Sequence, residues 1–317
     1  EYQALPQESR TVVFNNFLKT IAPPERSLAE RIVPSIGDIG VSALKGAIGL
    51  TEVPVGLADI ATGGRVGKTL EKVGYRPREA KEILSTLYSP EQQEAFKAVQ
   101  EAKGFIPTIV EAVKRPSTIA HTIVESAPSI LGGGAGARLI TKAVPKIAPY
   151  LAGAIGEGIV QVGSAAEQIR QQSPEGLITP KQAGAAVVSG IGTSLFGALG
   201  GKFAGSKLGQ KLGIMDVDTY LASGGQLPAA TKTGVLKRLA AGGLTEGVFE
   251  ELPQSAQEQV WNNVALDRPI MEGVPEAAAM GTLAGTAMGG AVSAMPLPRV
   301  PTPVAPPPPS KLQEAAN

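Results

Sequence analysis

The sequence predicts an all-α protein, a multi-helix bundle with Gly/Ala-rich helices and no significant sheet. Apolar residues recur at the spacing of one helix face, as at Ala80, Ile83, Leu84 and Leu87. No segment has the sustained two-residue alternation that a sheet needs. Aromatic residues make up only 4% of the 317 residues although 43% are hydrophobic. Small and short-branched side chains must therefore supply most of what the chain buries.

The composition excludes several kinds of functional site. The chain has no cysteine, which rules out disulfides, thiol catalysis, iron–sulfur clusters and thiolate metal sites. Its single histidine, His121, cannot form a multi-histidine metal site. We therefore predict no catalytic, cofactor-binding or metal-binding residue and no enzymatic activity. The net charge of +1 provides no overall electrostatic attraction for nucleic acid.

Residues 1–115 are predicted to form a soluble region of amphipathic helices. Apolar side chains between Val13 and Ile21 lie on one helix face, which the prolines that follow bring to an end. Another helix is predicted to start at Ser89-Pro90-Glu91-Gln92, which combines an N-cap serine, a proline at the first helical position and a glutamine at the capping-box position. This helix is expected to end at Gly104.

Residues 116–295 are predicted to form a second region, in which Gly, Ala and Ser fill helices that carry few charges. The predicted helices are Ser117–Gly136, Ala148–Ile169, Lys181–Gly213 and Glu276–Met295. Residues 296–317 are predicted to be a Pro-rich linker, because eight of the fourteen residues 296–309 are proline and such a run is a semi-rigid spacer. Since linkers join folded parts, we expect the chain to be a segment of a larger polypeptide.

Two uncharged segments have a length relevant to membranes. Gln182–Gly201 lies between Lys181 and Lys202, and 277–298 lies between Glu276 and Arg299. Twenty helical residues span about 30 Å, the thickness of the hydrocarbon core of a bilayer. The abundance of Gly, Ala, Ser and Thr makes their transfer to lipid only weakly favourable. We predict that they face a membrane or another subunit, with Lys181, Lys202 and Arg299 as membrane-interface anchors.

Small residues repeat every four positions in these same segments. The first row is Ala185, Ser189, Thr193, Gly197, Gly201, Gly205, Gly209 and Gly213, and the second row is Gly281, Gly285 and Gly289. Small residues at this spacing let helix backbones approach closely, in membranes and in soluble bundles alike. We predict a helix-packing or oligomer interface at Gly197, Gly201, Gly205, Gly209, Gly213, Gly281, Gly285 and Gly289.

Two glycine-containing strings resemble nucleotide motifs without meeting their requirements. Gly63–Thr69 has three residues between the glycines where a phosphate-binding loop needs four. Gly132–Ala137 matches a dinucleotide-binding string, but no predicted strand precedes it. We predict a turn before a helix at the first string and a hinge or tightly packed glycine bend at the second.

The glutamates between residues 246 and 258 form the densest acidic group. The spacing of Glu246, Glu250, Glu251 and Glu258 predicts a solvated acidic face opposite an apolar face that contains Phe249. His121 has no evident catalytic partner and is predicted to be structural or exposed.

The C-terminal third of the chain resembles a known family. The segment is Glu246-Gly-Val-Phe-Glu-Glu-Leu-Pro-Gln-Ser-Ala-Gln-Glu258, followed by Asp267-Arg-Pro269 and Glu272–Gly281. It is similar to the internal virion, or DNA-ejection, proteins of short-tailed bacteriophages, in which an acidic Gln-rich helix precedes a small-residue helix within a very large multi-domain polypeptide. The resemblance is carried by residues 240–295, and 116–240 are similar in style.

The resemblance implies a virion protein that is stored in the capsid interior or tail and then enters the host cell envelope. It also implies a homo-oligomer that forms a membrane channel for phage DNA, which passes through without sequence-specific contact. The implied partners are other phage ejection, portal or tail proteins and the host membrane. Some family members carry a peptidoglycan-cleaving domain, for which this chain has no motif.

Three alternatives stay open on the residues alone. In the first, the chain is an internal core, tail or tape-measure scaffold protein that never inserts in lipid. In the second, it is a segment of a cell-wall-degrading virion enzyme that uses Glu246 or Glu250. In the third, it is a toxin translocation region with similar small-residue helices.

Overall fold

The computed structural model describes residues 36–224 and 233–294. In these ranges 82% of the residues are helical and no strand occurs, which confirms the predicted all-α, multi-helix bundle. The predicted helix near Val13, the Pro-rich linker 296–317 and Arg299 lie outside the described residues.

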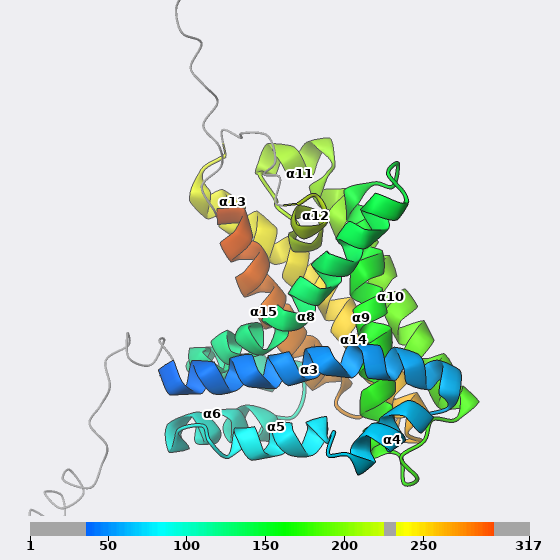
Figure 1. Cartoon of the computed structure of the whole chain (residues 1–317). Coiled ribbons are helices and arrows are strands. Elements are labelled where there is room, and N and C mark those ends of the chain that lie inside the picture. Colours follow the sequence, from blue (N-terminus) through cyan, green and yellow to red (C-terminus); the bar gives the residue numbers. More distant parts are fainter. Residues whose placement is uncertain (1–35, 225–232, 295–317) are drawn as a thin grey trace, which may run out of the picture.

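The helices follow one another with short connections (Figure 1). In chain order they are α3 (Ile36–Thr62), α4 (Arg65–Lys72), α5 (Pro77–Ser85), α6 (Pro90–Glu101), α7 (Phe105–Lys114), α8 (Pro116–Ala143), α9 (Pro149–Gln172), α10 (Pro180–Ala204), α11 (Lys207–Leu212), α12 (Val217–Ala222), α13 (Val235–Leu244), η2 (Thr245–Glu251), α14 (Leu252–Ala265) and α15 (Val274–Ala294).

Proline and capping side chains fix where many of these helices begin. Five of them start with proline, which has no N–H to leave unpaired in the first turn. At the start of α10 the capping box is complete: Thr179 accepts from the Gln182 N–H (3.3 Å), and Gln182 accepts from the Thr179 N–H (2.9 Å). At the start of α6, Ser89 accepts from the Gln92 N–H.

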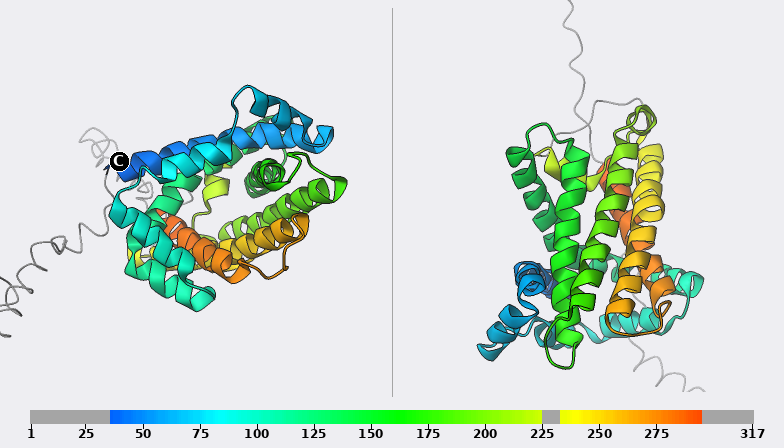
Figure 2. Two further views of the ribbon diagram at one scale, coloured as in Figure 1. Left: turned by 90° about the horizontal axis from the view of Figure 1, so that it is seen from below. Right: turned by 90° about the vertical axis from the view of Figure 1, so that its right-hand side faces the viewer.

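α9 lies at the centre of the molecule. It packs against α3, α8, α10 and α12, and from below it is seen between α3 on one side and α10 with α14 on the other (Figure 2). α10 packs on α14, which packs on α15, so that these helices stand side by side. α3 crosses them at one end, with α5 and α6 beneath it (Figure 1). Through α3, the described part of residues 1–115 packs directly against the small-residue region, residues 116–295.

Helix backbones meet at glycines where these helices cross. A Cβ built on Gly163 of α9 would lie 2.9 Å from Cα of Val53 on α3, and one built on Gly56 of α3 would lie 2.8 Å from the carbonyl carbon of Gly163. α9 and α10 meet in the same way at Gly158 and Gly190. The helices are therefore closer than any larger residue would permit.

Fully buried charged groups join α3, α4 and α9. Arg170 donates to both oxygens of Glu167, at 2.7 and 2.8 Å, and lies 3.4 Å from Asp59. Asp59 also accepts from the Gly67 N–H of α4 with both oxygens. In the string Gly63–Thr69, which resembles a phosphate-binding loop, the Gly67 N–H is thus bound by the carboxylate of Asp59. The element before this string is the helix α3 and not a strand. The predicted turn before a helix is confirmed.

Two details of the predicted helices were wrong. The predicted helix Lys181–Gly213 is two helices, because Ser206 accepts from the Gly209 N–H and starts α11, which Gly213 ends with a φ of 72°. Gly132–Ala137 is neither a hinge nor a bend but the interior of α8, where Gly133 and Gly134 are buried against α9 and α12.

Candidate functional site

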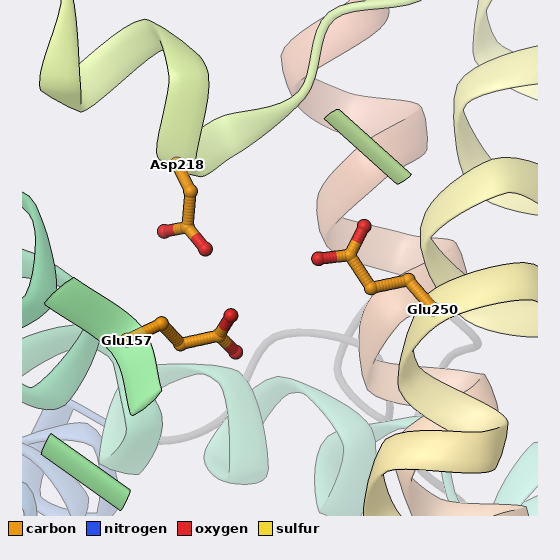
Figure 3. Close-up of side chains that lie close together, drawn as sticks. All are labelled: Glu157, Asp218 and Glu250. Carbon is orange, nitrogen blue, oxygen red and sulfur yellow. The ribbon is translucent and has the colours of Figure 1, made fainter. Parts of the chain in front are cut away.

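Five carboxylates from three elements meet inside the bundle. They are Glu157 of α9, Asp216 and Asp218 at the start of α12, and Glu246 and Glu250 of η2, and we call them the carboxylate cluster. Glu157, Asp218 and Glu250 point toward one another (Figure 3). In that group, and in the group Asp216, Glu246 and Glu250, one oxygen of each residue lies within 4.8 Å of the others. Glu250 belongs to both groups.

η2 turns its acidic side inward. It is a seven-residue π-helix, a form that occurs mostly as short insertions in α-helices and often at functional sites. Glu246 and Glu250 are buried, with Glu250 only 3% exposed, whereas Phe249 is 67% exposed. The predicted solvated acidic face opposite an apolar face was therefore wrong, because the polar side of this segment faces the interior and the apolar side faces outward.

Hydrogen bonds hold individual members of the cluster in place. Asp216 caps α12 by accepting from the Thr219 N–H at 2.6 Å, and Glu246 accepts from the Val217 N–H at 3.3 Å. Gln254 of α14 donates its amide N–H to Glu157. These bonds come from α12 and α14, so both helices orient the carboxylates.

The cluster has no cationic partner among the described residues. No lysine or arginine in those ranges forms an ion pair with any of its five members. Burial raises the pKa of Glu157, Glu246 and Glu250 well above the usual range, and neighbouring carboxylates raise it further. Burial, followed by the charge of Asp216, raises the pKa of Asp218 to about 7. Uncompensated, five ionised carboxylates would be very costly in this environment.

The cluster borders a cavity of about 530 Å³ that is partly open to solvent. Besides four of its carboxylates, Gln254 and Glu258 line this space, and Lys45 and Lys81 also line it. Both lysines have acidic partners elsewhere: Lys45 lies 3.1 Å from Glu125, and Lys81 lies 2.9 Å from Glu52.

Two further glutamates, Glu251 of η2 and Glu258 of α14, are partly buried near the cluster. Burial, together with the charge of Glu258, raises the pKa of Glu251 to about 8. Burial raises the pKa of Glu258 to about 7, against the opposing effect of a 2.7 Å hydrogen bond from Thr193. This side of the bundle is acidic well beyond the cluster itself.

The predicted glycines of the first row lie partly beside the cluster. A Cβ on Gly197 would be 2.8 Å from Oε2 of Glu157 and 3.4 Å from Oε1 of Glu250, and one on Gly201 would be 3.2 Å from Oδ1 of Asp216. These two glycines therefore leave room for the carboxylates. Gly205 is the C-cap of α10, Gly209 packs on the last turn of α10, and Gly213 ends α11.

The second row packs on the other side of the acidic segment. Cβ atoms on Gly281 and Gly285 of α15 would lie 2.7 Å from Cβ of Ser255 and 2.8 Å from Cβ of Glu251, and one on Gly289 would crowd Glu246. The two rows thus flank η2 and α14 within one chain. A role for these glycines between subunits stays a prediction.

Two of the three predicted membrane-interface anchors lie at the ends of α10. Lys181 is in its first turn and pairs with Asp267, and Lys202 is exposed in its last turn.

His121 is buried and bonded to its neighbours. Its Nδ1 lies 2.8 Å from Oγ of Ser42, which is 2.7 Å from the Tyr88 hydroxyl, and Ser42 and His121 are fully buried. Burial lowers the pKa of His121, although Asp38 raises it and Lys45 lowers it further. The arrangement brings a hydroxyl and an imidazole together without access for a substrate. Of the two predicted roles for His121, structural or exposed, the structure shows a buried residue.

Sequence reasoning missed the cluster as a site. Glu157, Asp216 and Asp218 were not singled out, because they lie far from Glu246 and Glu250 in sequence. One signal was present: residues 239–266 contain four glutamates and no lysine or arginine, whereas a solvated helix of this acidity is usually interspersed with basic residues at i±4.

Comparisons of this chain with protein-family models, curated proteins and solved structures gave no match.

Proposed function

We propose that this chain is a non-enzymatic structural virion protein of a short-tailed bacteriophage, which inserts in the host envelope and oligomerises into a channel for phage DNA. The assignment to a bacteriophage rests on the resemblance of residues 240–295 to the internal virion proteins of short-tailed phages. The membrane step rests on one observation of the fold: apolar side chains face outward where charged side chains face inward.

The outward side of α10 supplies the main apolar surface, which we call the apolar face. It comprises Val188, Ile191, Leu195, Leu199 and Phe203, all exposed and spaced three or four residues apart. Phe203 contacts the exposed Phe249 of η2, with ring centroids 6.5 Å apart. Contiguous apolar surface of this kind marks contact with lipid or with another protein.

The inward side of α10 is small and polar, and it adjoins the carboxylate cluster. Ser189, Thr193 and Gly197 are buried there, and Thr193 bonds to Glu258. Ionisable groups that face the interior of a bundle, with apolar side chains outside, are the arrangement that a bilayer tolerates. Among the described helices, α3 and α10 are long and apolar enough to cross a membrane by length and composition.

Partial exposure in water and transfer to lipid place opposite demands on such a helix. α10 satisfies both because its apolar side chains are interspersed with Gly, Ala, Ser and Thr, which keeps the transfer free energy small. The net charge of +1 suits a conduit that does not retain DNA by electrostatic attraction. Expected partners are further copies of the chain and other ejection, portal or tail proteins.

Vesicle flotation tests the membrane step. The full chain is mixed with vesicles of phosphatidylethanolamine and phosphatidylglycerol, and both flotation and leakage of an entrapped dye are measured. We expect the wild type to float and to release dye. Leu195→Glu should abolish both, because it places a charge on the apolar face. Ile83→Glu is the matched control, since Ile83 is similarly exposed (64%) but lies on α5, away from that face.

Other outcomes separate the alternatives. A wild type that neither floats nor releases dye contradicts the membrane step. If Leu195→Glu then abolishes self-association in solution, the apolar face joins protein copies and the scaffold alternative takes over. Equal flotation of both variants and the wild type would show that the apolar face has no part in lipid binding.

A further inference from the structure

We propose that the carboxylate cluster binds a hard divalent cation. Glu250, which belongs to both groups of the cluster, is the central ligand, and the side-chain oxygen of Gln254 is a neutral ligand. This inference is independent of the proposed function, because it concerns the interior of the bundle rather than the apolar face.

The ligand set consists of oxygen atoms only. Glu157, Asp218 and Glu250 form one group, and Asp216 and Glu246 form a second with the same Glu250. Carboxylate oxygens are the preferred ligands of Ca²⁺, Mg²⁺ and Mn²⁺. Opposite ligands of Ca²⁺ lie about 4.8 Å apart, since each Ca–O bond is about 2.4 Å. The oxygens of each group lie within this separation of one another.

Gln254 is a second, independent indication of a bound cation. Its side chain is 4% exposed and lines the same cavity as the cluster. The amide N–H bonds to Glu157, and the side-chain oxygen of Gln254 is the atom left without a partner among the described residues. No donor in the described ranges reaches this buried oxygen. A buried amide oxygen without a donor is costly, and a cation beside Glu157 would satisfy it.

The carboxylates themselves also have unused oxygens. One oxygen each of Glu157, Asp216 and Glu250 is buried without a hydrogen-bond partner in the described part of the chain. Glu157, Glu250 and Gln254 line the same cavity, and Asp216 belongs to the second group, which shares Glu250 with the first. The N–H groups of Val217 and Thr219 hold Glu246 and Asp216 from behind, as outer contacts commonly do for metal-binding carboxylates.

The surrounding elements make room for this arrangement. Gly197 and Gly201 lack the Cβ atoms that would crowd Glu157 and Asp216. On the far side, Gly285 and Gly289 let α15 approach Glu251 and Glu246 closely. The charge balance favours a cation as well, because the cluster has no lysine or arginine partner in the described ranges and buried charges are normally paired or coordinate metals.

Manganese binding tests this proposal directly. The full chain is titrated with Mn²⁺ at pH 8, and the electron paramagnetic resonance signal of free Mn²⁺ is recorded. We expect saturable loss of the free signal, which Ca²⁺ or Mg²⁺ reverses by competition. Glu250→Gln should lower the affinity about tenfold or more, because it alters both groups. Asp218→Asn should lower it too, and it provides a second variant if the first fails to fold.

Glu258→Gln is the matched control. Glu258 is also partly buried and lines the same cavity, but it bonds to Thr193 and belongs to neither group. Circular dichroism checks that each variant is folded. The proposal is overturned if the wild type shows no saturable binding, which would leave protons alone to neutralise the cluster. It is also overturned if folded Glu250→Gln and Asp218→Asn bind Mn²⁺ as the wild type does, or if Glu258→Gln loses binding to the same extent.

Discussion

Gly40 and Gly56 lie on the same helix and have different surroundings. A Cβ on Gly40 would meet no atom within 4 Å, whereas one on Gly56 would lie 2.8 Å from the carbonyl carbon of Gly163 and 2.9 Å from N of Glu167. Both of those atoms belong to the backbone of α9, which cannot move aside as a flexible side chain can. Only one of the two glycines is therefore required by packing.

Alanine substitution at the two positions should change stability in opposite directions. Gly56→Ala is expected to lower the free energy of unfolding by about 1–3 kcal/mol through overpacking. Gly40→Ala should raise it by about 0.5–1 kcal/mol, because alanine favours the helix. Urea unfolding followed by circular dichroism measures both values. Equal effects would show that α3 and α9 do not pack through Gly56.

Glu258 should make the protein less stable as the pH rises. Its pKa is about 7 in the folded chain, raised by burial from the ordinary value of 4.5. The folded state therefore holds a proton that the unfolded state has lost between these two values. The stability present below pH 4.5 decreases as the pH rises through about 7.

Glu258→Gln should remove this contribution while still accepting the hydrogen bond from Thr193. We expect a shallower decrease in unfolding free energy between pH 5 and 8, and a gain on the order of 2 kcal/mol at pH 8. Denaturant unfolding in a buffer with a chelator measures this without added cations. A variant that loses stability in parallel with the wild type would contradict the assignment to Glu258.

At the level of whole elements, the start of α10 was fully predictable. Thr179, Pro180 and Gln182 specify a cap, an N1 proline and a reciprocal partner over four adjacent residues, and the structure contains both hydrogen bonds. Such signals are local, so the sequence alone determines them.

Thr179→Ala should lower the free energy of unfolding by about 1 kcal/mol, because it leaves a first-turn N–H without its acceptor. Thr141→Ala is the matched control: Thr141 is partly exposed and its hydroxyl donates to the carbonyl of Arg138 within α8. We expect its effect to stay within about 0.5 kcal/mol. Urea unfolding of both variants decides whether the capping box stabilises α10.

The orientation of η2 was not predictable by the same reasoning. Periodicity places Glu246 and Glu250 on one side of a helix, but it does not say whether that side meets water or another helix. The decision depends on Gly197 and Gly200 of α10 and on Gly285 and Gly289 of α15, which are distant in sequence and leave room for the glutamates of η2. The π-helical geometry of η2 also departs locally from the α-helical repeat, and residue spacing in the sequence does not reveal this departure.

For the molecule as a whole, the all-α class followed from composition and periodicity, whereas the distribution of polarity did not. The buried hydrophobic residues are mostly alanine, and many of the largest fully buried side chains are polar, such as Arg170, His121 and Glu167. Tertiary packing determined this distribution, because glycine crossings bring backbones together and leave polar side chains in the spaces between helices. The carboxylate cluster is one result and the apolar face is the other.

The glycine crossings also determine how the molecule responds to force. Where α3 meets α9, and where α9 meets α10, the backbones approach each other at Gly56, Gly163, Gly158 and Gly190. Dispersion attraction between packed atoms decreases by about a quarter to a half when a gap of about 0.5–1 Å opens. Under tension these helices should resist stiffly and then part abruptly after a very small extension. We therefore expect the folded chain to be mechanically brittle rather than ductile, with its helices separating first at the glycine crossings.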